Sequence, residues 1–200
     1  LPPMGSSSGV PEQGAIVFVG NLAYPPNEDA VRWFVKEVFP KIRGRVPGAR
    51  FLVVGKNPTA AVLTLRSLPG VEVTGAVPDV GPYIDRAAVV VNPVRFGTGT
   101  RIKLLEALAR GKAVVSTVAG AAGLDLRPGQ DFLLADEPED FANKVADLLQ
   151  NEAMMLSIGK EGRRAVEKYR WALVARQYEG ILTATLRSSS CPSWTSEMAL

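Results

Sequence analysis

The sequence predicts a doubly wound α/β domain built on a six-stranded, mainly parallel sheet. Three observations predict it: six short apolar runs, five of them rich in β-branched residues, helical patterns between them, and turn-forming residues after them. Strands that are apolar on both faces and alternate with helices are typical of a parallel sheet that is covered on both sides. The crossovers between such strands are expected to be right-handed.

The predicted strands and helices alternate along the chain. The strands cover residues 15–20, 49–55, 71–75, 88–93, 112–117 and 131–135. Helices are expected at 27–42, 61–65, 80–87, about 100–110, 138–150 and, in two pieces, 152–187. In open α/β sheets ligands bind beyond the carboxyl ends of the strands, so we expect the loops there to meet on one edge and form the site.

The composition sets the ends of the domain and excludes several classes of protein. Residues 1–14 have linker composition without a basic or apolar leader region, 15–187 form the predicted domain, and 188–200 are expected to be disordered or extraneous. No histidine and one cysteine exclude a histidine general base, a zinc cluster and an intrachain disulfide within this chain. A net charge of +3 favours an anionic ligand but is too small to indicate nucleic-acid binding, and no apolar run is long enough to span a bilayer.

The stretch "RFGTGTRIKLLEALARG", residues 95–111, has the residue types of an anion-binding loop. Gly97 and Gly99 permit close approach of the backbone to a ligand. A helix that begins near Thr100 would add unpaired amides and a positive dipole end, and Arg101 and Lys103 add full charges in the same turn. This pattern favours a diphosphate, although Arg101 on a solvated helix surface is the alternative.

Glu106 lies one turn after Lys103 on the same helix face, where its carboxylate could accept hydrogen bonds from ribose hydroxyls. A surface ion pair between Lys103 and Glu106 explains the spacing equally well. Two other phosphate motifs are absent: no GxxxxGK[ST] occurs, and a GxGxxG fingerprint would need a glycine in place of Ile102. A nicotinamide cofactor is therefore not expected.

Five motifs in the same order give this chain a resemblance to a known family. "VFVGNLAYPPNEDAVRWF", "FLVVG", "VEVTGAVPDVGPYI", "VVVNPVRFGTGTRIKLLEALARGKAVVSTVAGAAGL" and "DFLLADEPEDFANKVADLL" resemble the C-terminal half of retaining glycosyltransferases of family 4, of the bacterial surface-glycan or exopolysaccharide type. The resemblance covers residues 15 to about 185. It implies a Rossmann-like domain of the GT-B fold that binds a nucleoside-diphosphate sugar.

The resemblance also implies roles for individual residues. Glu106 matches the second glutamate of the family's E-x7-E motif, which holds the ribose, whereas the first is replaced by Thr98. The family's arginine and lysine in the first loop are replaced by Asn21 and Pro26. Arg101, Lys103 and Glu106 are then the predicted catalytic residues, and the predicted donor-binding residues are Gly20, Asn21, Ala76, Val77, Gly97, Thr98, Gly99 and Thr100, with Ala76 and Val77 beside the nucleobase.

The implied enzyme transfers the sugar with retention and needs neither a metal nor a cofactor. Its expected partners are the nucleotide-sugar donor and an N-terminal acceptor-binding domain that this chain lacks, so the chain alone would bind donor but catalyse little. A cytoplasmic protein is expected, either free or at the inner membrane face. A lipid-linked acceptor near the basic stretch 160–176 would place it there, although a solvated helix face explains that stretch more simply.

Two other classes of function stay open at this point. A non-enzymatic binding module of the same fold would use the same loop without preferring nucleotide sugars to other phosphate compounds. A pure interaction domain would have no pocket, and substitution of Glu106 would affect no ligand.

Overall fold

The computed structural model describes residues 11–99 and 101–188, and they fall into two compact units. The first unit ends at Glu167 and contains the sheet with the helices that cover it; the second begins at Lys168 and contains the last helix. The predicted domain, residues 15–187, covers both. The predicted linker is described only from Pro11, and the predicted tail lies outside the described residues except for Ser188, the last residue of the final helix.

The sheet has the predicted six strands, and every pair of neighbours is parallel. The strands are β1 (Ala15–Val19), β2 (Arg50–Val54), β3 (Val71–Gly75), β4 (Val89–Asn92), β5 (Ala113–Ser116) and β6 (Leu133–Leu134). Their order across the sheet is β3-β2-β1-β4-β5-β6, so the direction of the crossovers reverses between β1 and β4. Ligands of doubly wound folds bind beside this reversal.

The helices follow the predicted alternation. They are α1 (Pro25–Trp33), the π-helical η1 (Phe34–Val38), α2 (Phe39–Arg45), α3 (Ala60–Leu63), η2 (Thr64–Ser67), α4 (Gly81–Arg86), α5 (Ile102–Ala109), α6 (Val118–Ala121), α7 (Pro138–Gln150), α8 (Glu152–Ala165), η3 (Val166–Tyr169) and α9 (Trp171–Ser188). Because right-handed crossovers change side where their direction reverses, α1 to α3 cover one face of the sheet and α4 and α5 the other. Helix α7 packs beside α2, and α8 packs beside α5.

The first long helix contains a π turn that the sequence pattern does not predict. The amide of Phe39 donates to the carbonyl of Phe34, five residues back, instead of four. Pro40 follows and has no N–H to donate to the preceding turn. The proline therefore accounts for the change of hydrogen-bond register between α1 and α2.

Other elements also differ from their predicted bounds. Strand β6 has only two residues instead of five, and α6 forms a single helical turn within the segment predicted as a loop. Helix α5 begins at Ile102, not near Thr100, and Arg101 precedes it with non-helical dihedral angles. Its predicted end is confirmed, because Gly111 has a φ of 71° after the last turn, the left-handed conformation of a helix-ending glycine.

A cluster of buried aromatic rings joins the sheet to the helices on one face. The Phe34 ring lies 4.5 Å from that of Phe51 in β2 and 5.8 Å from that of Phe141 in α7, centroid to centroid. All three side chains are inaccessible to solvent. The rings hold η1, β2 and α7 together.

In the second unit, α9 is amphipathic, and several of its large apolar side chains are exposed: Trp171, Leu173, Tyr178, Ile181 and Leu182. Over the described residues, no helix is both long enough and apolar enough to cross a membrane.

Phe51→Ala tests the importance of the aromatic cluster. Removal of this buried ring should lower the free energy of unfolding by about 3–5 kcal/mol, because a cavity replaces its contacts. Phe96→Ala is the matched control, since Phe96 is 49% exposed and its loss should cost well under about 1 kcal/mol. Chemical denaturation measures both changes, and equal losses would contradict this description of the core.

Candidate functional site

A small cavity lies at the carboxyl edge of the sheet, beside the reversal between β1 and β4. Its volume is about 110 Å³. Its lining comes from the loop after β1 with the start of α1, from the end of β4 and the loop after it, and from the start of α5. The lining residues are Tyr24, Pro26, Asn27, Asn92, Val94, Phe96, Thr98, Arg101 and Lys103. Two stretches that lie far apart in sequence, 24–27 and 92–103, thus form one polar site.

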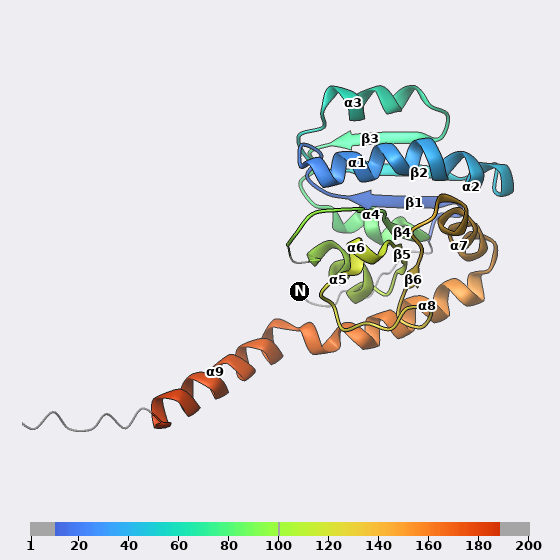
Figure 1. Cartoon of the computed structure of the whole chain (residues 1–200). Helices are drawn as coiled ribbons and strands as arrows, with labels where there is room; N and C mark the ends of the chain where they lie inside the picture. Colours follow the sequence, from blue (N-terminus) through green and yellow to red (C-terminus); the bar gives the residue numbers. More distant parts are fainter. Residues whose placement is uncertain (1–10, 100, 189–200) are drawn as a thin grey trace, which may run out of the picture. The chain divides into compact units, whose positions relative to one another are not determined.

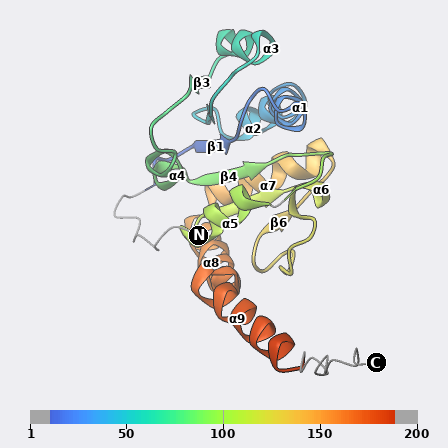
Figure 2. The ribbon, with the colours of Figure 1, turned by 90° about the vertical axis from the view of Figure 1, so that its left-hand side faces the viewer.

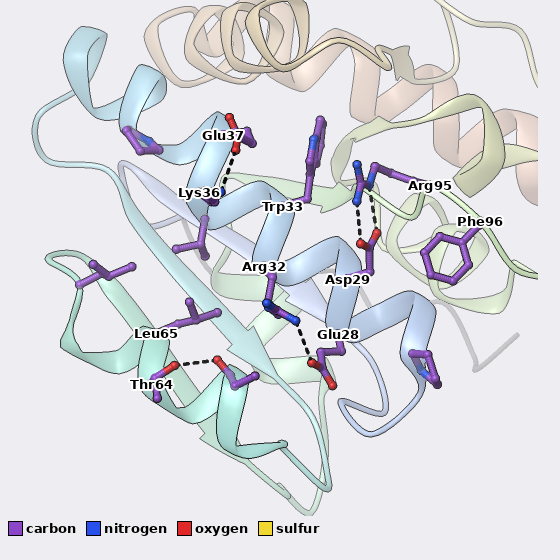
Figure 3. Close-up of a pocket in the computed structure, with 15 residues that line it drawn as sticks. Glu28, Asp29, Arg32, Trp33, Lys36, Glu37, Thr64, Leu65, Arg95 and Phe96 are labelled. Carbon is purple, nitrogen blue, oxygen red and sulfur yellow. Dashed lines mark hydrogen bonds and ion pairs between the residues drawn. The ribbon is translucent and has the colours of Figure 1, made fainter.

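Gly97 allows the stretches 24–27 and 92–103 to approach each other closely. Its φ is 108°, and a Cβ atom there would lie 2.9 Å from the Pro26 side chain. Any other residue would therefore strain the backbone and push the two loops apart. Arg95 anchors the same loop to α1 by two hydrogen bonds to Asp29, of 3.0 and 2.6 Å, shown in Figure 3. The hydrogen bonds to the Asp29 carboxylate hold the pKa of the Arg95 guanidinium above its ordinary value, so this anchor stays charged.

Lys103 extends from the first turn of α5 into the cavity. Its Nζ donates a 2.6 Å hydrogen bond to Oδ1 of Asn27 and lies 4.5 Å from the centre of the buried Phe18 ring. Burial, and to a smaller degree the neighbouring charge of Arg101, lower the pKa of Lys103 from 10.5 to about 8. Among the described residues no carboxylate forms an ion pair with Lys103, so a bound anion would stabilise its charge.

Arg101 provides the second cation of the cavity. Its Nη2 donates to the carbonyl of Gly97 at 3.0 Å, which closes the loop before α5. Its Nε is buried and has no acceptor in the structure. This guanidinium is therefore held in place and keeps an unused donor, which argues against the alternative of a merely solvated side chain.

Glu106 lines a second, smaller hollow, together with Lys103 and Asn92. Its nearest described charge partner is Arg110, whose Nε lies 3.8 Å from the carboxylate, too far for a hydrogen bond. The alternative of a Lys103–Glu106 surface pair does not describe the structure, because Nζ of Lys103 bonds to Asn27 instead. The Glu106 carboxylate thus lines the hollow and accepts no hydrogen bond from the side chains that the structure describes.

Two asparagines in the site were not singled out by the sequence analysis. Asn27 accepts from Lys103 and donates from Nδ2 to the carbonyl of Asn21 at 2.9 Å, so it joins the first loop to α5. Asn92 ends β4 and is only 2% exposed. A polar residue that ends an apolar central strand, as in "VVVNP", is a signal that could have found Asn92.

The other predicted donor-binding residues that the structure describes do not line the cavity. Gly20 packs on Asn27, since a Cβ atom there would lie 2.8 Å from the Asn27 amide nitrogen. The Asn21 side chain accepts from the amide of Ala23 in its own loop and from Nδ2 of Asn57 in the loop after β2. Ala76 and Val77 follow β3 at the same edge, Gly99 is exposed with a φ of 119°, and Thr100 lies outside the described residues.

A much larger hollow lies elsewhere, in an open groove of about 1000 Å³ between α1–η1 and α3–η2 (Figure 3). Its charged side chains are paired with one another: Arg32 with Glu28, Lys36 with Glu37, and Arg95 with Asp29. In the smaller cavity, neither Arg101 nor Lys103 has an acidic partner among the described residues. We therefore assign the site to the smaller cavity, on its chemistry and its position in the fold.

No group of histidine, cysteine, aspartate and glutamate side chains suited to a metal ion occurs in the described part of the chain. The positive charge of the cavity comes from Arg101 and Lys103.

Comparison with known proteins gives the family. The model of the family "Glycosyl transferases group 1" matches residues 13–151. The chain belongs to this family. The group 1 glycosyltransferase match spans the whole sheet and the cavity, so both belong to the part of the chain that defines the family.

Relatives and solved structures agree with this assignment. A phosphatidyl-myo-inositol mannosyltransferase of Mycobacterium tuberculosis is 30% identical over 183 residues, which are 84% of this chain and 47% of the relative. A protein of the Klebsiella pneumoniae cps region is 23% identical over 151 residues, 72% of this chain and 39% of that protein. The chain thus spans less than half the length of these curated relatives.

Two solved structures have the same fold. The C-terminal domain of a group 1 glycosyl transferase family protein (LpcC) from Francisella tularensis superposes with a TM-score of 0.62 at 18% identity, covering 81% of this chain and 89% of that domain. Anabaena HepE, in complex with UDP and glucose, gives a TM-score of 0.67 at 16% identity, covering 86% of this chain and 48% of HepE.

The lowered pKa of Lys103 predicts a pH dependence of stability. Between about 8 and 10.5 the unfolded chain holds this proton and the folded chain does not, so the free energy of unfolding should rise with pH in that window. The gain is at most about 3 kcal/mol. The difference in unfolding free energy between wild type and Lys103→Met, measured by denaturation across this range, should grow with pH; a constant difference would contradict the assignment.

Proposed function

We propose that this chain is the donor-binding half of a retaining hexosyltransferase and that its cavity holds the diphosphate of a nucleoside-diphosphate sugar. One observation carries the proposal: two cations, Arg101 and Lys103, that have no carboxylate partner in the described part of the chain lie at the amino end of α5 beside the reversal of the sheet. Unpaired helix amides and cations at such a place are a diphosphate site. The UDP complex of Anabaena HepE, a protein of the same fold, supports this ligand class.

Each site residue has a definite task in this proposal. Lys103 and Arg101 neutralise the diphosphate and stabilise the charge that develops on it as the bond to the sugar breaks. Their positive charge makes a metal ion unnecessary for that task. Glu106, one helical turn further on and beside the same hollow, accepts the ribose hydroxyls. The loop after β3, with Ala76 and Val77, lies beside the nucleobase.

The acceptor domain belongs to the remainder of the full-length enzyme in this proposal. The share of the relatives that the chain spans, 39–47%, supports this division, as does the match to an isolated C-terminal domain. The chain alone should then bind donor without transferring sugar. Two relatives, a protein of a cps region and a phosphatidyl-myo-inositol mannosyltransferase, support an acceptor in surface glycan synthesis, at a membrane face if it is lipid-linked.

Calorimetric titration with UDP, GDP, ADP and dTDP tests the donor site, with inorganic pyrophosphate as the comparison ligand. One nucleoside diphosphate should bind in preference to the others and to pyrophosphate. Lys103→Met should weaken both the diphosphate and pyrophosphate by about tenfold or more, because a charge-assisted hydrogen bond is lost. Lys36→Met, which removes an exposed cation in the groove, is the matched control and should change neither affinity.

Glu106→Ala separates the nucleotide site from a general phosphate site. It should weaken the selected nucleoside diphosphate by about fivefold to tenfold and leave pyrophosphate unchanged, since only the nucleotide carries a ribose. Equal affinities for all diphosphates and pyrophosphate in the wild type, with no effect of Glu106→Ala, would instead support a phosphate-binding module without nucleotide preference.

Affinity should also depend on pH, because the protonated form of Lys103 binds the anion. With a pKa of about 8 in the free chain, the affinity for the diphosphate should fall as pH rises through that value, and the fall should disappear in Lys103→Met. Titrations at several pH values above and below the pKa of Lys103 measure this, and parallel behaviour of the two proteins would contradict it.

A further inference from the structure

Asn92 is the most deeply buried polar residue of the cavity and has a binding capacity that the protein does not use. It is the last residue of β4, at the strand that borders the reversal of the sheet. Its Nδ2 donates to the carbonyl of Gly120 at 2.8 Å and to Oγ of Ser116 at 3.3 Å. Its Oδ1 is buried without any hydrogen-bond donor in the structure.

The surroundings fix the orientation of this amide. A Cβ atom on Gly120 would lie 2.7 Å from Nδ2 of Asn92 and 2.5 Å from Oγ of Ser116, so α6 is pressed directly against the asparagine. A rotation that exchanged the amide oxygen and nitrogen would place the oxygen against the Gly120 carbonyl, two acceptors in contact. Oδ1 is thus held as an acceptor without a donor.

Buried acceptors without a donor are rare in folded proteins and indicate a missing partner. Asn92 lines both hollows of the site, together with Lys103 in each of them. A partner must therefore fit beside two cations, Lys103 and Arg101, and must bring a hydrogen-bond donor to Oδ1. The ionised oxygens of a phosphate group satisfy the cations, but they are acceptors and bring no donor to Oδ1.

We propose that Oδ1 of Asn92 accepts a hydrogen bond from a hydroxyl of the transferred sugar and helps to select that sugar. The inference rests on the proposed function, because a diphosphate on Lys103 and Arg101 places the sugar beside them. A sugar esterified to that diphosphate brings both the negative charge and the hydroxyl donor. A buried acceptor that must be satisfied discriminates strongly against analogues that lack the hydroxyl.

The experiment compares the selected nucleoside diphosphate with its glucose ester, both titrated calorimetrically into the wild type, Asn92→Leu and Ser116→Ala. Asn92→Leu keeps the size of the side chain and removes the acceptor. We expect it to weaken the glucose ester by about fivefold to tenfold and the diphosphate by less than about twofold. Ser116→Ala loosens the same amide without removing Oδ1 and should shift both ligands alike.

A second measurement needs no variant and covers the case in which Asn92→Leu does not fold. The wild type is titrated with the four esters of 2-, 3-, 4- and 6-deoxyglucose. One of them should bind about fivefold to tenfold more weakly than the glucose ester, and in a folded Asn92→Leu protein that difference should vanish.

The outcomes separate the two proposals. Absence of diphosphate binding by the wild type would overturn the proposed function and this inference with it. Normal diphosphate binding with equal losses of both ligands in Asn92→Leu, or with four deoxy esters that all bind as glucose does, would overturn the role of Asn92 alone. It would leave a buried water as the partner of Oδ1.

Discussion

The site depends on the hydrogen bond between Lys103 and Asn27. This contact joins the helix after β4 to the helix after β1 across the reversal of the sheet, and 76 residues separate its two ends. Asn27 in turn holds the first loop through the carbonyl of Asn21. The arrangement places an ammonium group beside a buried phenyl ring, where its charge is poorly solvated. Burial therefore destabilises the charged form of Lys103, and an anion bound beside it would stabilise that form.

The distribution of paired and unpaired charges distinguishes the two hollows of this domain. In the large groove each cation has an acidic neighbour, so the groove offers little net attraction to an anion. In the small cavity Lys103 bonds to a neutral amide and Arg101 to a backbone carbonyl. Volume alone would favour the large groove. The unpaired charge and the position at the reversal of the sheet both favour the small cavity.

Much of the fold could be predicted from the sequence, because each strand is a short apolar run, rich in β-branched residues in all but β6, and because the glycine that ends α5 has a local conformational reason. The six strands, their parallel pairing and the glycine that ends α5 are confirmed. The π turn before Pro40 could not be predicted, since it depends on hydrogen-bond register, not on apolar spacing. The late start of α5 depends in the same way on the Arg101 backbone.

The site could be predicted in part. The cations Arg101 and Lys103 and the polar Thr98 do line one cavity, as the loop composition indicated. Asn27 and Asn92 were missed because their importance lies in contacts with residues 76 and 24–28 positions away, which no local pattern contains. Gly97 was predicted to approach a ligand. In the structure it approaches Pro26, in the first turn of α1.

The most direct test of the central claim is a crystal structure of this chain with the nucleoside diphosphate that it binds most tightly. The account predicts the diphosphate at the amino end of α5, with phosphate oxygens within hydrogen-bond distance, about 2.7–3.2 Å, of Lys103 Nζ and of the Arg101 guanidinium. Lys103 would then have exchanged Asn27 for the phosphate or share its protons between them. A diphosphate bound in the groove between α1 and α3, or held without contact to Lys103, would contradict it.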